Sequence, residues 1–127
     1  MLVFVYGTLM SGLQLSHILD SSEFLGEVIA SEVCLYNLGP YPAIKLGDEA
    51  VMGELYYVND ETLQQLDMVE GFYPEDLRNS LYHRKKIKIL LPTIDSDVVA
   101  YFYNGPIDSS RLIVSGDYRA HINSKVS

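Results

Sequence analysis

Short apolar runs alternate with turn-forming residues along the chain, a pattern that predicts a protein built mostly of strands. The continuous apolar run Leu2–Tyr6 stops at Gly7, which is typical of a buried strand. The stretch 24–36 is rich in β-branched and aromatic residues and predicts one strand or two. Further strands are predicted at Ala43–Leu46, Val51–Val58, Leu81–Leu91 and Val98–Tyr103.

Turns are predicted between several of these strands. Residues 38–42 contain two prolines around a tyrosine, so they cannot join a central ladder and are expected to form a turn. Gly47, Asp48 and Glu49 are expected to form a second turn, which would separate two strands.

Helical periodicity is weaker. Asn59 or Asp60 is expected to cap a helix that carries Leu63, Leu66 and Val69 on one apolar face and ends at Gly71. A short helix over Leu13–Leu19, capped by Ser11 or Gly12, is also expected. Strands therefore dominate, and the pattern predicts an α+β fold whose sheet curls towards a barrel.

Composition narrows the class of protein. The chain has 127 residues, of which 48% are hydrophobic, and it shows no linker or repeat, so we expect a single domain over residues 1–127. The formal net charge of −8 argues against nucleic acid and against an anionic membrane surface as partners. No apolar run approaches spanning length and no signal peptide is visible, so we expect a soluble cytoplasmic protein. The oligomeric state is left open.

The glycine loop Tyr6–Gly12 is the first candidate site. It is not a phosphate-binding P-loop, because Leu13 and Gln14 stand where lysine and serine or threonine are needed. Gly7 has no Cβ, so a ligand could approach the backbone closely, and successive N–H groups after a strand can bind an anion. The alternative is an ordinary turn at the end of a strand.

Glu70 is the second candidate. Asp67 and Glu70 are spaced to share a helical face in the last turn, where the helix dipole disfavours acids. Partial burial beside Val69 and Phe72 would raise the pKa of Glu70 towards neutrality, as a general base requires. The alternative is a solvated glutamate at a helix end.

The remaining polar features favour structural interpretations. The basic run His83–Lys88 could form a local anion or nucleic-acid patch, but the solvent face of a strand explains it better. The histidines are too scattered to show metal-ligand spacing, so no metal is expected, and the single cysteine, Cys34, is expected to be a buried hydrophobe.

Several motifs, in their order along the chain, resemble the gamma-glutamylcyclotransferase-like family, in particular its small AIG2-like and gamma-glutamylamine cyclotransferase members. The resemblance spans about residues 2 to 118. The matching pieces are Val5–Leu9, Phe24–Gly26, Pro42–Ala43, Val51–Tyr56, Leu66–Asp67 with Glu70–Gly71, Tyr82 with Arg84, and Ala100–Tyr103.

The resemblance implies a fold, a reaction and roles for particular residues. The fold would be a small mixed β-barrel with a few flanking helices. The free α-amino group of a γ-glutamyl amine or peptide would attack its own γ-carbonyl, releasing 5-oxoproline and an amine or amino acid, with no metal, cofactor or covalent intermediate. Glu70 would be the catalytic acid and base, and the turn would bind the α-carboxylate. The substrate-binding residues implied are Tyr6, Gly7, Thr8 and Leu9 in the turn, and Tyr41 and Tyr101 in the pocket wall.

Two other functions use the same features. A binding module could hold a small carboxylate metabolite in the same pocket without turnover, and a structural or protein-interaction domain would need no pocket at all. The sequence also differs from the commonest family pattern, because Gly12–Leu15 precedes His17 and the stretch Tyr73–Leu81 is long. That stretch follows the proposed acid and could cover the pocket.

Overall fold

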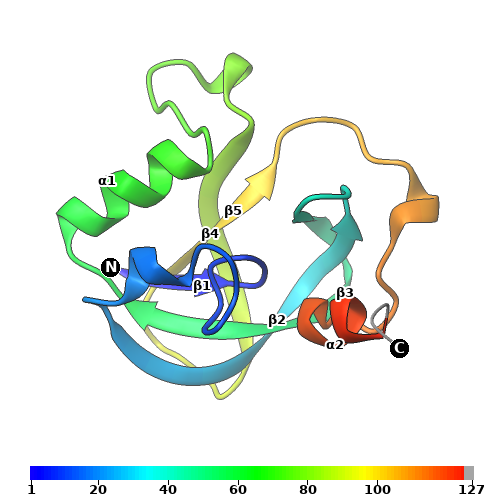
Figure 1. The fold of residues 1–127 in the computed structure, drawn as a ribbon, viewed down its shortest axis with the longest axis horizontal. Helices are drawn as coiled ribbons and strands as arrows, with labels where there is room; N and C mark the ends of the chain where they lie inside the picture. Colours follow the sequence, from blue (N-terminus) through cyan, green and yellow to red (C-terminus); the bar gives the residue numbers. More distant parts are fainter. Residues whose placement is uncertain (125–127) are drawn as a thin grey trace.

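The computed structural model describes residues 1–124 and contains a closed barrel of five strands (Figure 1). The predicted α+β barrel is therefore confirmed. The strands are β1 (Leu2–Val5), β2 (Glu23–Asn37), β3 (Pro42–Tyr57), β4 (Tyr82–Leu91) and β5 (Val98–Tyr103). The helices are α1 (Asp60–Val69) and α2 (Tyr118–Asn123), with short 3₁₀ turns η1 (Ser16–Leu19), η2 (Leu77–Asn79) and η3 (Ser109–Arg111). None of the described helices is long and apolar enough to cross a membrane.

The barrel closes through its shortest strand, β1. The strand order is β1-β3-β2-β4-β5, and β1 pairs with β3 on one side and with β5 on the other. The β1–β5 pairing is parallel, whereas β1 runs antiparallel to β3. Val3, Phe4 and Val5 are buried because β1 has a neighbouring strand at both edges and core on its faces. This environment explains why its sequence is continuously apolar instead of alternating.

The predicted turn at residues 47–49 is wrong, because β3 continues through this stretch. Val33 on β2 pairs with both Leu46 and Glu49, so the turn-forming residues make a bulge in the strand. A Cβ at Gly47 would collide with the sulfur of Cys34, which is buried as expected. Glycine at this position therefore allows β2 and β3 to approach each other closely.

Helix α1 follows the predicted boundaries closely. The side chain of Asn59 accepts a hydrogen bond from the Thr62 N–H at 2.8 Å, and Gly71 lies beyond the helix with φ of 64°. Leu66 is fully buried, but Val69 is 45% exposed. The helix therefore buries less of its last turn than its periodicity predicts, and this leaves Val69 at the edge of a cavity.

Two of the remaining helical segments, η1 and α2, differ from expectation. The predicted helix over Leu13–Leu19 is reduced to η1, because the Leu15 N–H bonds to the Thr8 carbonyl at 2.8 Å and ties this segment to the preceding loop. Helix α2 is too short to show an apolar period, and the sequence analysis did not predict it.

Candidate functional site

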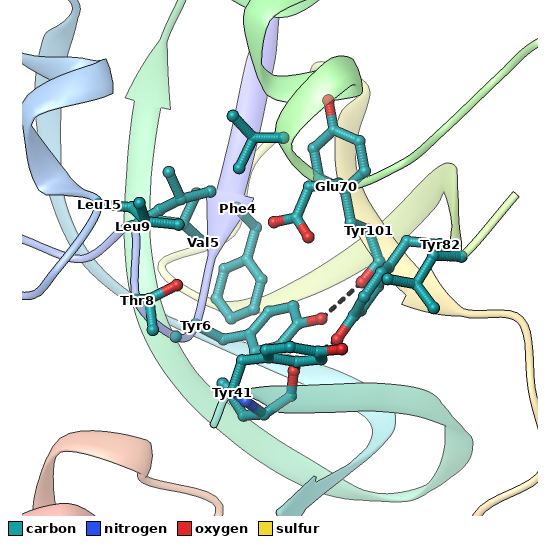
Figure 2. A pocket seen from close by; sticks show the side chains of 14 residues that line it. Phe4, Val5, Tyr6, Thr8, Leu9, Leu15, Tyr41, Glu70, Tyr82 and Tyr101 are labelled. Atoms are coloured by element: carbon teal, nitrogen blue, oxygen red, sulfur yellow. Dashed lines mark hydrogen bonds between the residues drawn. The ribbon is translucent and has the colours of Figure 1, made fainter. Parts of the chain in front are cut away.

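A cavity of about 100 Å³ opens beside the end of β1, between the glycine loop and the end of α1 (Figure 2). All the residues proposed from the sequence as site residues contribute to its wall. The lining consists of Phe4, Val5, Tyr6, Gly7, Thr8, Leu9, Leu15, Tyr41, Pro42, Val69, Glu70, Leu81, Tyr82 and Tyr101. Glu70 is the only carboxyl side chain among these lining residues, and none of them has a cationic side chain.

The glycine loop forms a tight turn as soon as β1 ends. The Met10 N–H bonds to the Gly7 carbonyl at 3.0 Å, which closes the turn. The N–H groups of Gly7, Thr8 and Leu9 have no hydrogen-bond acceptor among residues 1–124. Because such donors need a partner when they are buried, the turn is suited to bind an anionic ligand group.

Gly7 is also required by the packing of the turn. A Cβ at this position would lie 2.5 Å from Cγ and 2.9 Å from Cδ of Pro42. The absence of a side chain thus permits two close approaches, one by Pro42 and one by a ligand.

Replacing Gly7 by alanine is expected to shift the turn and weaken ligand binding by about tenfold, because the new methyl group would clash with the Pro42 ring. Isothermal titration with a γ-glutamyl compound measures the loss. The double variant G7A/P42A removes the clashing ring atoms and should recover most of the affinity. If Gly7→Ala alone binds as the parent does, the packing argument is wrong.

Glu70 immediately follows α1 and caps its C-terminus. Its N–H bonds to the Leu66 carbonyl at 2.9 Å, and the left-handed Gly71 then turns the chain away. Figure 2 shows the Glu70 carboxylate pointing into the cavity. Burial raises the pKa of Glu70 to about 7, from a usual value of 4.5. A carboxylate with this pKa can both accept and return a proton near neutral pH.

Asp67 does not share the environment of Glu70, despite their helical spacing. The Asp67 carboxylate accepts hydrogen bonds from Arg84 and from the Tyr101 hydroxyl, both at 2.6 Å. These bonds attach α1 to β4 and β5. Arg84 therefore points inward, although the sequence analysis assigned its basic run to a solvent face; Lys85, Lys86 and Lys88 are exposed as that analysis expected.

Tyrosine rings form the wall around Glu70. The Tyr6 hydroxyl donates to the Tyr101 carbonyl at 2.6 Å, and the Tyr82 hydroxyl donates to the Pro42 carbonyl at 2.9 Å. Burial, and then the Glu70 charge, raise the pKa of Tyr6 and of Tyr82 above the usual value. Both side chains therefore remain neutral, and each hydroxyl already donates a hydrogen bond to a backbone carbonyl.

Tyr82 belongs to one of the motifs that resemble the family, but the sequence alone predicts no role for its side chain. Tyr82 is the first residue of β4 and pairs with Tyr103, while Arg84 pairs with Tyr101. Two-residue alternation puts Tyr82 and Arg84 on the same face of β4, and the inward Arg84 could have revealed Tyr82 as a wall residue.

The rim of the cavity is apolar and half-exposed. Tyr41, Val69 and Leu81 line the cavity and are 37%, 45% and 43% exposed. Leu81 is the last residue of the long stretch 73–81, whose position is fixed by a bond of 2.9 Å from the Leu81 N–H to the Gly71 carbonyl. A ligand group too large for the cavity would therefore contact apolar side chains on leaving it.

Comparison with known proteins points to one family. The family model described as gamma-glutamyl cyclotransferase, AIG2-like, matches residues 3–120. The Escherichia coli K12 protein named gamma-glutamylcyclotransferase family protein YtfP is 33% identical over 118 residues, which are 93% of this chain and 96% of that protein.

Two further relatives extend the comparison. A Niallia circulans protein named gamma-L-glutamyl-butirosin B gamma-glutamyl cyclotransferase is 34% identical over 79 residues, which are 61% of this chain and 51% of that protein. The crystal structure of an uncharacterised Pyrococcus horikoshii protein superimposes with a TM-score of 0.78 at 22% identity, covering 98% of this chain and 95% of that one. This last likeness shows the shared fold.

Proposed function

Because this chain belongs to the AIG2-like gamma-glutamyl cyclotransferase family, we propose that it converts a γ-glutamyl amine or γ-glutamyl peptide into 5-oxoproline and the free amine or amino acid. The family and the names of its curated relatives support gamma-glutamylcyclotransferase activity on a small γ-glutamyl molecule in general. The reaction as proposed uses neither a metal nor a cofactor.

The observation that carries the proposal is Glu70, a carboxylate with a pKa of about 7 that points into a cavity opposite unpaired N–H groups. The N–H groups of Gly7, Thr8 and Leu9 would bind the α-carboxylate of the substrate. The α-ammonium group next to that carboxylate would then lie near Glu70. An ammonium must lose a proton before it becomes a nucleophile, and Glu70 is suited to accept it.

The proposed reaction is an intramolecular acyl transfer. Glu70 takes one proton from the α-ammonium, and the amine nitrogen forms a bond to the γ-carbonyl carbon. Glu70 returns this proton to the leaving nitrogen as the bond from this carbon to that nitrogen breaks. The ring nitrogen then loses its second proton, which leaves on the released amine as an ammonium or passes to water, and the neutral lactam of 5-oxoproline remains. Holding the glutamyl chain curled is a large catalytic contribution, since well-oriented groups supply about 7 to 11 kcal/mol. The small cavity and its ring walls favour the curled conformer.

The cavity is large enough for only one part of the proposed substrate. About 100 Å³ suits the glutamyl group, so the leaving group would lie outside, against Tyr41, Val69 and Leu81. The lining provides no cation for a carboxylate on the leaving group. We therefore expect a γ-glutamyl amide of an apolar amine to react better than the matched γ-glutamyl amino acid.

Release of 5-oxoproline tests the proposal directly. The panel consists of γ-glutamyl-leucine, γ-glutamyl-isopentylamide, γ-glutamyl-ε-lysine and glutathione; the first two differ only by one carboxylate. Turnover of at least one compound is expected, with isopentylamide ahead of leucine. Binding without any 5-oxoproline would overturn the enzyme proposal in favour of a carboxylate-binding module, and neither binding nor turnover would overturn both.

The pH dependence of the rate provides a second test. Because Glu70 must be deprotonated to accept a proton, kcat/KM is expected to fall about tenfold per pH unit below a midpoint near 7. Initial rates between pH 5 and 9 measure this limb. A flat profile down to pH 5 would contradict the assignment of Glu70 as the base.

A further inference from the structure

Glu54 on β3 is a buried acid that contributes nothing to the cavity wall. Its side chain is 5% exposed, yet its two oxygens accept four hydrogen bonds. Oε1 accepts from the Ser11 N–H at 2.7 Å and from the Tyr56 hydroxyl at 3.1 Å. Oε2 accepts from the Ser11 hydroxyl at 2.9 Å and from Arg119 at 3.2 Å. All four partners donate, and this arrangement suits a carboxylate because a carboxylate only accepts hydrogen bonds.

Both ends of the glycine loop are attached to Glu54. The backbone of Glu54 pairs with Val5, the last residue of β1, where the loop begins. Its carboxylate holds Ser11, where the loop ends. Of the residues between these two attachments, 6 to 9 line the cavity.

The loop is supported in part by packing, since Tyr6, Leu9 and Met10 are buried in the core. A second hollow of about 400 Å³ is lined by Met10, Glu54 and Arg119 among others. No residue lines both hollows. Residues 6–9 line the first hollow and Met10 lines the second, so the bonds from Ser11 to Glu54 add directional support where the packing around the loop is incomplete.

Helix α2 completes the arrangement. Arg119 brings a positive charge to the buried carboxylate, which would otherwise be costly to bury. The segment before α2 is attached to the same strand, through a 2.8 Å bond from the Met52 N–H to the Gly116 carbonyl. The C-terminal helix is thus connected through Glu54 to the glycine loop.

We infer that Glu54 is a positioning residue that holds the substrate-binding loop in place, with Arg119 of α2 as its charge partner. The ligand of that loop is the one named under the proposed function, on which this part of the inference rests. Glu54 acts through Ser11 and the loop, so it affects how tightly the γ-glutamyl group is bound and leaves the proton transfer by Glu70 unaffected.

Steady-state kinetics with the best γ-glutamyl substrate test the inference. Glu54→Gln removes the negative charge and is expected to raise KM about tenfold, the usual effect of weakening a charged hydrogen bond. We expect kcat to change by less than about threefold, and the acid limb to keep its midpoint near pH 7. A purely structural defect would instead lower the active fraction, reducing kcat at constant KM.

Two variants of Arg119 test the charge partner. Its side chain is half-exposed, so its replacement disturbs the core less than a change at Glu54 does. Arg119→Ala should raise KM in the same direction, and Arg119→Lys should restore most of the parent value, since it keeps the charge. Arg111→Ala is the control: Arg111 lies in the same C-terminal stretch, but its side chain donates to the Asn37 carbonyl and not to Glu54. Equal KM values in the parent, Glu54→Gln and Arg119→Ala would overturn the inference, as would failure of Arg119→Lys to rescue.

Amide hydrogen exchange decides the same question without a substrate. Exchange at Met10 and Ser11, whose N–H groups are hydrogen-bonded, should be about tenfold faster in Glu54→Gln and in Arg119→Ala, while amides of α1 and those of Arg111→Ala keep parent rates. If Glu54→Gln does not fold, Arg119→Ala carries this test. Unchanged loop exchange overturns the inference, whereas absence of 5-oxoproline alone overturns only the proposed function.

Discussion

Replacing Glu70 by glutamine is expected to lower the rate of 5-oxoproline formation by about 10²- to 10⁴-fold while the substrate still binds. Glutamine has nearly the same shape, so the cavity and the unpaired N–H groups of the turn should be preserved. It cannot accept a proton from the α-ammonium group, so the nucleophile would form only by loss of the proton to water. Single-turnover release of 5-oxoproline and calorimetric titration measure the two effects separately.

The matched control is Glu75→Gln, the same change at an exposed position just after the site. It should keep the parent rate. If Glu70→Gln retains a rate near that of the parent, the catalytic assignment of Glu70 is wrong, and the pocket would serve only binding.

Unfolding measurements on Glu70→Gln give an independent readout of the same carboxyl group. The pKa of Glu70 is raised on folding from 4.5 to about 7, so the folded state binds more protons than the unfolded state between these values. The contribution of this group to the free energy of unfolding is therefore undiminished below about pH 4.5, falls as pH rises to about 7 and is constant above. Relative to the parent, the glutamine variant should gain stability as pH rises through this window.

Replacing Asp67 by alanine is expected to lower the free energy of unfolding by about 3 kcal/mol. The change leaves the Arg84 guanidinium and the Tyr101 hydroxyl without their shared acceptor, in a place where Arg84 is 24% and Asp67 14% exposed. It also releases α1 from β4 and β5, so the position of Glu70 should become less defined and the rate should fall. Urea unfolding and the rate of 5-oxoproline release measure the two losses.

The control for this variant is an ion pair whose cation, Lys86, lies on β4 as Arg84 does. Lys86 and Asp97 form an ion pair at 3.2 Å, but their side chains are 75% and 72% exposed. Asp97→Ala is expected to change the free energy of unfolding by no more than about 0.5 kcal/mol, because exposed pairs are screened by water. Equal losses from Asp67→Ala and Asp97→Ala would contradict the structural role assigned to Asp67.

Strong local signals predicted several elements correctly. The apolar run of β1, the cap at Asn59 and the stop at Gly71 each depend on residues next to them in sequence. The bulge in β3 was misinterpreted as a turn, because glycine and acidic residues suit both structures. Only the pairing of Val33 with two partners distinguishes the bulge from the turn.

In the candidate site, too, some residues could be predicted from local motifs and others could not. The turn at Gly7 and the acid Glu70 could be proposed from motifs, and the structure places both at one cavity. The separation of Asp67 from Glu70 could not be proposed, because it requires Arg84 and Tyr101 to arrive from strands distant in sequence. The same is true of Glu54, whose partners Ser11 and Arg119 come from opposite ends of the chain.

The sequence by itself determined the α+β class, the family and the acid that follows the helix, because these are written in short patterns and their order. Only the tertiary structure decided how strongly that acid is desolvated, which cation pairs with its neighbour and what holds the loop. Proton affinity depends on the atoms that surround a group in space, and closing a barrel brings together residues that no local pattern connects.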